Sequence, residues 1–212
     1  MKIDFVSDVT CPWCAIGLTA LLAALDRLGG QVQAEIHLQP FELNPGMPPE
    51  GADIVEYMGR KYGMSAAQVA ERRAVIRQRG AEVGFAFGPR ERTWNTFDAH
   101  RLLHWAGGEG RQLQLKLGLL AAYHTRGENP SSHEVLLRLA GEAGLDTGRA
   151  RAVLDSGEFG PEVRSRIGHL RALGIDSVPA AIIDDRHLIQ GGQPVEAFER
   201  ALREIAAGRV DA

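Results

Sequence analysis

Hydrophobic and polar residues alternate in two short stretches near the N-terminus, with a longer periodic stretch between them. Lys2–Ser7 and Val32–Phe41 have a period of two, which predicts strands. The leucines from Leu18 to Leu28 recur every three to four residues and predict a helix that ends at Gly29-Gly30. Thr10 is the expected N-cap of this helix. The β-α-β order favours a parallel pair of strands with a right-handed crossover.

The middle of the chain shows helical periodicity almost exclusively. After a proline-rich stretch at 41–49, the pattern predicts helices over Ile54–Tyr62, Ser65–Val83, Thr96–Trp105, Arg111–Arg126, Ser132–Ala143, Thr147–Asp155 and Pro161–Leu173. Ser65 is expected to cap its helix without a full capping box, because no acid stands three residues later. The basic run of Arg72, Arg73, Arg77 and Arg79 is interpreted as a solvated helix face rather than a binding patch.

Strand character returns near the C-terminus. Val178–Ile183 and His187–Gln190 flank Asp184-Asp185 and predict a hairpin. Pro194 then opens a last amphipathic helix. The end of the chain therefore supplies β-β-α.

Cys11 and Cys14 are the only cysteines in the sequence, separated by Pro12-Trp13 where the first helix is expected to begin. Residues three apart share a helix face, so their Cα atoms fall within the roughly 4.4–6.8 Å that a disulfide requires. The free N–H groups and positive dipole of a helix start stabilise a thiolate. We therefore expect Cys11 to be the attacking thiol and Cys14 the resolving thiol of a redox pair.

Two other interpretations of the cysteines remain open. A zinc site would need two more ligands, and His100 and His104, four residues apart on a predicted helix, are conceivable partners. The pair could also be two inert buried thiols. The strand-to-helix setting favours redox chemistry over both.

Composition narrows the setting of this chemistry. The net charge of −3, from 24 basic and 27 acidic residues, argues against a broad nucleic-acid footprint. No apolar run is long enough to span a membrane, and no apolar signal core follows Met1. We expect a cytoplasmic protein, in which the cysteine pair would rest largely as the dithiol.

The element order and several motifs together resemble the DsbA family, and within it the cytoplasmic FrnE-like branch. The resemblance is carried by Cys11–Gly17, Pro40–Pro45, Asn95-Thr96 with Ala99–Leu102, Ser177–Pro179 and Gly191–Pro194. It implies an α/β fold: a thioredoxin fold with a large all-helical domain inserted between its β-α-β and β-β-α halves. The expected division is residues 1–45 and 166–212 for the thioredoxin-like halves and 46–165 for the insertion.

The resemblance also implies a set of site residues. Val178–Pro179 would be the family's cis-proline step beside the sulfurs. The expected substrate-binding residues are Trp13, Phe41, Asn95, His100, Val178 and Pro179, with Thr96 and Asn44 as further candidates. His100 has the alternative of a purely structural role. Ala15 and Ala180-Ala181 stand where this branch often has aromatic residues, which leads to the hypothesis of a more open or differently shaped substrate groove. No metal is expected, and no cofactor beyond the redox pair, with glutathione as a candidate co-substrate.

The predicted function is thiol-disulfide exchange with a protein or a small thiol or disulfide, the direction being left open. Two rival classes are kept. One is a glutathione-dependent enzyme of the 2-hydroxychromene-2-carboxylate isomerase or kappa-class transferase type. The other is a peptide-binding chaperone. The sequence indicates no membrane or nucleic-acid partner and does not give an oligomeric state.

Overall fold

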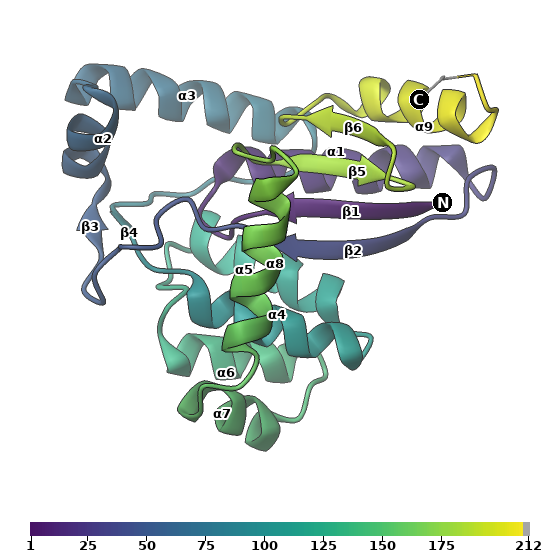
Figure 1. Cartoon of the computed structure of the whole chain (residues 1–212). Coiled ribbons are helices and arrows are strands. Elements are labelled where there is room, and N and C mark those ends of the chain that lie inside the picture. The colour runs from purple at the N-terminus through teal and green to yellow at the C-terminus, as the bar shows by residue number, and fades with distance from the viewer. Residues whose placement is uncertain (210–212) are drawn as a thin grey trace.

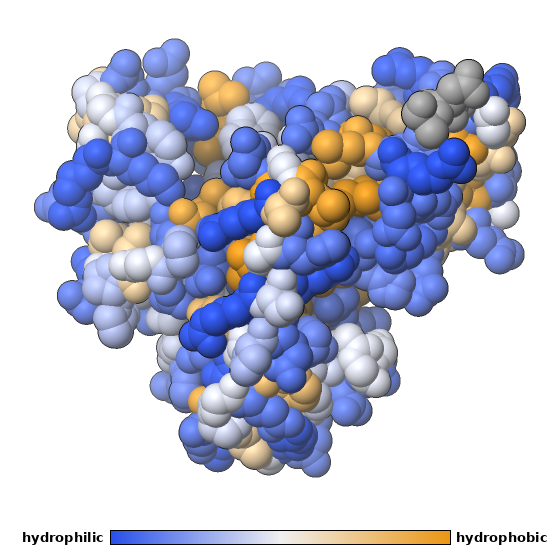
Figure 2. Space-filling model, in the orientation of Figure 1, coloured by the Kyte–Doolittle hydropathy of each residue, from blue (hydrophilic) through white to orange (hydrophobic). Residues whose placement is uncertain are grey.

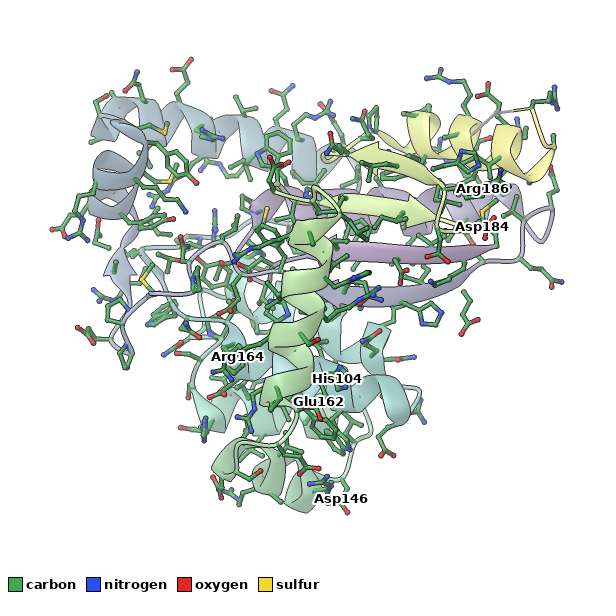
Figure 3. The ribbon with its side chains drawn as sticks, in the orientation of Figure 1. His104, Asp146, Glu162, Arg164, Asp184 and Arg186 are labelled. Atoms are coloured by element: carbon green, nitrogen blue, oxygen red, sulfur yellow. The ribbon has the colours of Figure 1, made fainter. Side chains whose placement is uncertain are left out.

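The centre of the molecule is a mixed sheet of four strands, seen in a computed structural model that describes residues 1–209 (Figure 1). β1 (Lys2–Ser7) pairs in parallel with β2 (Glu35–Pro40) and antiparallel with β5 (Ala180–Ile183). β6 (His187–Gln190) completes the order β2-β1-β5-β6. The turn between β5 and β6, where Asp184 and Arg186 are labelled in Figure 3, has Asp184 and Asp185 at φ 50° and 57°. Aspartate tolerates such angles better than most residues.

Helices cover both faces of this sheet. α1 (Pro12–Leu28) and α9 (Val195–Ala206) pack together behind it, burying Phe5, Leu21 and Phe198 in one core. α8 (Gly160–Ala172) crosses the front, where Leu170 packs against Val6 (Figure 1). The front surface is mainly hydrophilic, with apolar side chains gathered where the sheet lies uncovered between α8 and α9 (Figure 2).

A helical segment packs beside β2. It contains α4 (Phe97–Gly108), α5 (Gln112–His124), α6 (His133–Glu142) and α7 (Thr147–Asp155), which enclose a leucine-rich core of their own. Gln112 joins this segment to the sheet. Its side-chain oxygen accepts a hydrogen bond from the Leu38 amide at 2.8 Å, and its side-chain nitrogen donates to the Leu38 carbonyl at 3.1 Å.

A two-helix arm lies beyond the C-terminal ends of β1 and β2, and its second helix runs back beside α1 (Figure 1). It consists of α2 (Ile54–Tyr62) and α3 (Ala66–Glu82), held at its base by a short ribbon of β3 (Ala52–Asp53) and β4 (Arg92–Thr93). The Asp53 side chain accepts hydrogen bonds from the Val55 and Glu56 amides and so caps α2.

The predicted fold class is confirmed, and the differences are local. The N-cap of α1 is Cys11 instead of Thr10, because Pro12 already occupies the first turn and the Thr10 hydroxyl donates instead to Asp8. Ser65 does form a full capping box, since the Gln68 side chain reaches back as a glutamate would.

Two further features concern the arm and the insertion. The β3–β4 ribbon was not predicted, because strands of two residues carry no periodicity. The predicted boundary between the helical insertion and the second thioredoxin-like half lies between residues 165 and 166. This position falls inside α8, which is continuous from Gly160 to Ala172. The three-part division stays a prediction.

Candidate active site at the start of the first helix

The two cysteines lie one helical turn apart at the buried start of α1. Cys11 is the N-cap, with extended backbone angles of φ −83° and ψ 114°. The Cys14 amide donates to the Cys11 carbonyl at 3.1 Å. Both thiols are free, and Cys11 is 4% exposed while Cys14 is fully buried. Access from outside is therefore to Cys11.

The two thiols differ in pKa because their surroundings differ. A hydrogen bond with the Cys14 thiol, helped by the Cys14 and Trp13 amides, lowers the pKa of Cys11 against the opposing effect of burial. Burial, and then the neighbouring Cys11, raise the pKa of Cys14 well above its usual value. This is the order required if Cys11 is the nucleophile and Cys14 stays protonated until it is needed.

Two loops close on the cysteine pair from the far end of the sequence. The Val178–Pro179 peptide bond is cis. The Cys11 thiol donates to the Val178 carbonyl oxygen at an S–O distance of 3.7 Å. A Cβ placed on Gly17 would lie 3.0 Å from Pro179 Cγ, and one on Gly192 would lie 3.1 Å from Trp13. A methyl group at either position would require the neighbouring residue to shift by a few tenths of an ångström, so glycine favours this close approach.

A cavity of about 410 Å³ opens in front of Cys11. One wall is formed by the cysteine motif, with Trp13, and by Val178. The other wall comes from the arm, whose α2 and α3 supply aromatic and aliphatic side chains. The guanidinium-bearing residues of the lining are Arg72, Arg73 and Arg90. The arm and the thioredoxin-like part thus share one cavity, which is large enough for the side chains around a disulfide.

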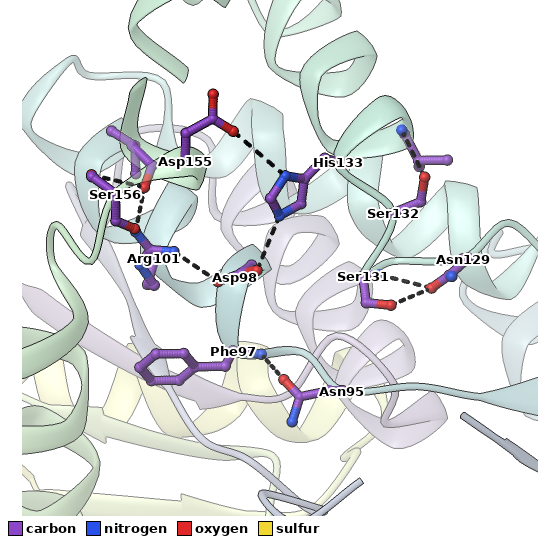
Figure 4. Close-up of polar contacts among 12 residues, drawn as sticks. Asn95, Phe97, Asp98, Arg101, Asn129, Ser131, Ser132, His133, Asp155 and Ser156 are labelled. Carbon is purple, nitrogen blue, oxygen red and sulfur yellow. Dashed lines mark hydrogen bonds and ion pairs between the residues drawn. The ribbon is translucent and has the colours of Figure 1, made fainter. Parts of the chain in front are cut away.

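The predicted substrate-binding residues divide into two groups. Trp13, Val178 and Asn44 line the cavity, and Pro179 packs against α1 beside them. Phe41 is buried in the core, with the Arg171 guanidinium 5.5 Å from its ring centre. The side-chain oxygen of Asn95 accepts from the Phe97 amide at 2.8 Å, so it shapes the start of α4 (Figure 4). Phe41 and Asn95 are not among the residues that line the cavity.

His100 belongs to a buried polar cluster behind the motif. Its Nε2 lies 3.4 Å from Asp8 Oδ1, at ion-pair distance but without hydrogen-bond alignment. Asp8 Oδ2 accepts from the Leu43 amide at 2.8 Å. Burial alone would raise the pKa of Asp8, but His100, the Leu43 amide and Thr96 together lower it. His100 therefore holds the loop beside Cys11 from within and does not line the cavity in front of Cys11.

Lys116 of α5 completes this cluster. It is 1% exposed, and burial lowers its pKa in spite of the opposing effect of the nearby Cys14 and Asp8. An ammonium group in this place favours negative charge on the neighbouring sulfurs. Asp8, Lys116 and the three cavity arginines were all missed by sequence reasoning. The position of Asp8, between the first strand and Cys11, was the one signal available.

His104 does not lie at the cysteine site. It lies beside the lower half of α8, with its ring centre 5.3 Å from that of Phe159 (Figure 3). Within residues 1–209 no group of three or more histidine, cysteine, aspartate or glutamate side chains is placed to hold a metal ion.

The three alanines that stand where the FrnE-like branch often has aromatic residues are buried away from the cavity. Ala15 and Ala181 are buried in the core behind the sheet, and Ala180 is buried in the core beneath α8. None of them lines the cavity in front of Cys11. These alanines therefore do not shape the cavity by direct contact, and the hypothesis of a more open or differently shaped groove stays a prediction.

A sheet of this order, with a Cys-x-x-Cys pair opening its first helix and a proline loop facing it, defines a thioredoxin-fold protein with a dithiol site. The DSBA-like thioredoxin domain family matches residues 2–203, and the chain belongs to this family. The predicted resemblance to the DsbA family is thereby confirmed. Members of the family are thiol oxidoreductases and isomerases.

Three solved structures illustrate the similarity. The probable DsbA oxidoreductase SCO1869 from Streptomyces coelicolor is 31% identical, with a TM-score of 0.92 over 100% of this chain and 92% of its own. A 2-hydroxychromene-2-carboxylate isomerase is 15% identical, with a TM-score of 0.74 over 100% of both chains. The cytosolic disulfide reductase DsbM from Pseudomonas aeruginosa, with GSH, is 18% identical, with a TM-score of 0.67 over 98% of this chain and 100% of its own. Because their sequence identity to this chain is low, the last two structures are evidence for the shared fold only.

Proposed function

We propose that this protein is a thiol-disulfide oxidoreductase that uses Cys11 and Cys14 to exchange disulfides with protein substrates. The observation that carries the proposal is geometric: Cys11 stands at the N-cap of α1 and lines the cavity, with its sulfur 3.7 Å from the Val178 carbonyl oxygen, while Cys14 is buried one turn behind it. The lowered pKa of Cys11 and the raised pKa of Cys14 agree with this order of reaction.

The exchange runs in two steps. The Cys11 thiolate attacks one sulfur of the substrate disulfide, and the other substrate sulfur leaves as a thiolate that takes up a proton. Cys14 then loses its proton and attacks Cys11 Sγ, which breaks the mixed disulfide and releases the second substrate sulfur. The substrate gains two electrons and the Cys11–Cys14 pair loses two. The reverse sequence oxidises a substrate dithiol.

The finer assignments rest on the same reasoning. A cytoplasmic role agrees with the cytosolic location in the name of DsbM. The FrnE-like assignment rests on the sequence motifs, such as Cys11–Gly17 and Ser177–Pro179. Within residues 1–209 no helix is both long enough and apolar enough to cross a membrane. The redox pair itself serves as the reacting group, and glutathione is a candidate small co-substrate, since DsbM was solved with GSH.

The test is reduction of insulin disulfides by three forms of the protein. Cys11→Ser should abolish turnover. Cys14→Ser should also stop turnover but accumulate a mixed disulfide at Cys11, which mass spectrometry detects. Insulin reduction retained by Cys11→Ser would rule out the mechanism. Equilibration with glutathione buffers, followed by thiol trapping, gives the reduction potential and thus the direction of exchange.

A second candidate is glutathione-dependent isomerisation, which the similarity to 2-hydroxychromene-2-carboxylate isomerase brings forward. It predicts that the Cys11→Ser protein binds glutathione saturably in a calorimetric titration. A peptide-binding chaperone is the third. It predicts suppression of aggregation that is unchanged when both thiols are alkylated.

A further inference from the structure

The cavity in front of Cys11 is more basic than the chain as a whole. Arg72 and Arg73 of α3 and Arg90 of the segment before β4 all contribute to its lining. Among the described residues, Asp176 is the acidic residue of that lining. The full chain carries a net charge of −3, so positive charge is concentrated at this place.

In the part of the chain that the structure describes, the contacts that hold the cavity arginines involve no carboxylate. The Arg73 guanidinium donates to the Arg90 carbonyl oxygen at 2.8 Å. The Arg90 guanidinium lies 5.3 Å from the centre of the Tyr123 ring. Arg72 is exposed, and its Nη1 lies 3.8 Å from the Met64 sulfur.

An arginine outside the cavity does have a carboxylate partner, unlike the three that line it. Arg79, on the same helix, forms an ion pair with Glu82 at 3.2 Å. Within residues 1–209, no carboxylate oxygen lies within 4.0 Å of the Arg72, Arg73 or Arg90 guanidinium nitrogens. Three guanidinium groups around one cavity therefore remain available to a ligand, and their preferred partners are carboxylates.

We propose that this cavity selects protein disulfides whose cysteines are flanked by acidic residues. The inference rests on the proposed function and names its substrate class. The motif and Val178 receive the disulfide on one wall. Apolar side chains of the arm, such as Tyr62 and Ile76, accommodate the chain around it, and the arginines attract its carboxylates.

The test uses three oxidised peptides that differ only in the residue two positions from one cysteine of an internal disulfide: Glu, Gln or Lys. The reduced protein is mixed with each, and the second-order rate constant of disulfide exchange is measured in a single turnover. We expect the order Glu, then Gln, then Lys, with about tenfold between the extremes at low salt. The spread should shrink as salt is added.

Arg72→Glu and Arg77→Glu form a matched pair of variants. Both sit on α3, are exposed and change the charge by the same amount, but only Arg72 lines the cavity. Arg72→Glu should reduce the Glu-to-Lys rate ratio about tenfold or reverse it, while Arg77→Glu should keep the wild-type ratio.

The possible failures are distinguishable. Wild-type exchange at equal rates with all three peptides would overturn the acidic preference and leave the oxidoreductase proposal standing. The same change of ratio in both variants would assign the preference to overall charge and overturn the role of the cavity. No exchange with any peptide would refute the proposed function, and the inference with it.

Discussion

The Cys11 sulfur lies 3.7 Å from the carbonyl oxygen of Val178, although 167 positions separate the two residues in the chain. A disulfide that reaches Cys11 therefore passes beside the Val178 backbone. Some groups hold Cys11 and Val178 together, and others set the charge on the sulfurs. Replacing these groups should have the largest effect on disulfide exchange.

The two thiols should react in a fixed order. Because the pKa of Cys11 is lowered and that of Cys14 is raised well above its usual value, at neutral pH the thiolate forms first at Cys11. At pH 7 we expect iodoacetamide to label Cys11 at least about tenfold faster than Cys14, measured by mass spectrometry of the peptides. In Cys11→Ser, Cys14 should stay slow, since burial persists. Equal labelling of the two cysteines would contradict this assignment.

Gly17→Ala should separate Pro179 from the motif. The added methyl group would lie 3.0 Å from Pro179 Cγ, so the rigid ring and the neighbouring Val178 must move. We expect a loss of about 1–3 kcal/mol in the free energy of unfolding, together with slower disulfide exchange.

Gly118→Ala is the matched control for that substitution. Its methyl group would meet Leu139 Cδ2 at 3.6 Å, an ordinary contact, and the position is helical. Stability should be unchanged or raised by up to about 1 kcal/mol. Similar urea midpoints for Gly17→Ala and the wild type would mean that the Pro179 loop yields freely.

Asp8 and His100 should be energetically coupled. Both are buried, and Asp8 Oδ1 lies 3.4 Å from His100 Nε2. Removing one partner leaves the other unpaired in the interior, so Asp8→Asn and His100→Gln should each destabilise, by about 1–3 kcal/mol. The double variant should lose less than the sum, with a coupling of at least about 0.5 kcal/mol in a denaturation cycle. Strict additivity would show that the pair acts as two independent groups.

Stability should fall in mild acid because of His124. Burial, and then the charge of Arg90, hold the pKa of His124 well below 6.5, and its Nε2 lies 2.9 Å from the Val9 carbonyl oxygen. The unfolded chain protonates this histidine near its usual pKa, so the unfolded state binds more protons. The contribution of neutral His124 to the free energy of unfolding is complete above pH 6.5. It is lost as the pH falls towards the pKa of His124 in the folded state.

The pH effect can be isolated by comparing wild type and His124→Gln in urea between pH 7.5 and 5. The wild-type free energy of unfolding should decrease below pH 6.5 by up to about 1.4 kcal/mol per pH unit more than that of the variant. Parallel curves for the two proteins would show that His124 is not the group responsible.

Much of the fold could be predicted because its signals are local. The alternation of Lys2–Ser7 and the leucine period that follows it predict β1 and α1, whose bounds agree with the structure to within a residue or two. The cysteine spacing and the Val178–Pro179 step, read through the family resemblance, predict that these two segments lie side by side, and the structure places them so.

The rest of the site depends on contacts between distant segments. Arg72 and Arg73 look like a solvated helix face in the sequence, and only the placement of the arm beside α1 turns them toward the cavity. Lys116 has the pattern of an ordinary helix residue, and its burial near Cys14 follows from the packing of α5. Conversely, Asn95 and Phe41 carry the family pattern but serve the start of α4 and the core.

The Gln112 side chain occupies the hydrogen-bonding position at Leu38 that a further strand would need. Growth of the four-stranded sheet is thus blocked at β2, and β6, with Leu188 49% exposed, is the remaining edge of that sheet. A sheet with one open edge can pair with the open edge of a second molecule. The combined sheet then has only blocked edges. Self-association through strands would therefore end at a pair of molecules and could not continue into a filament.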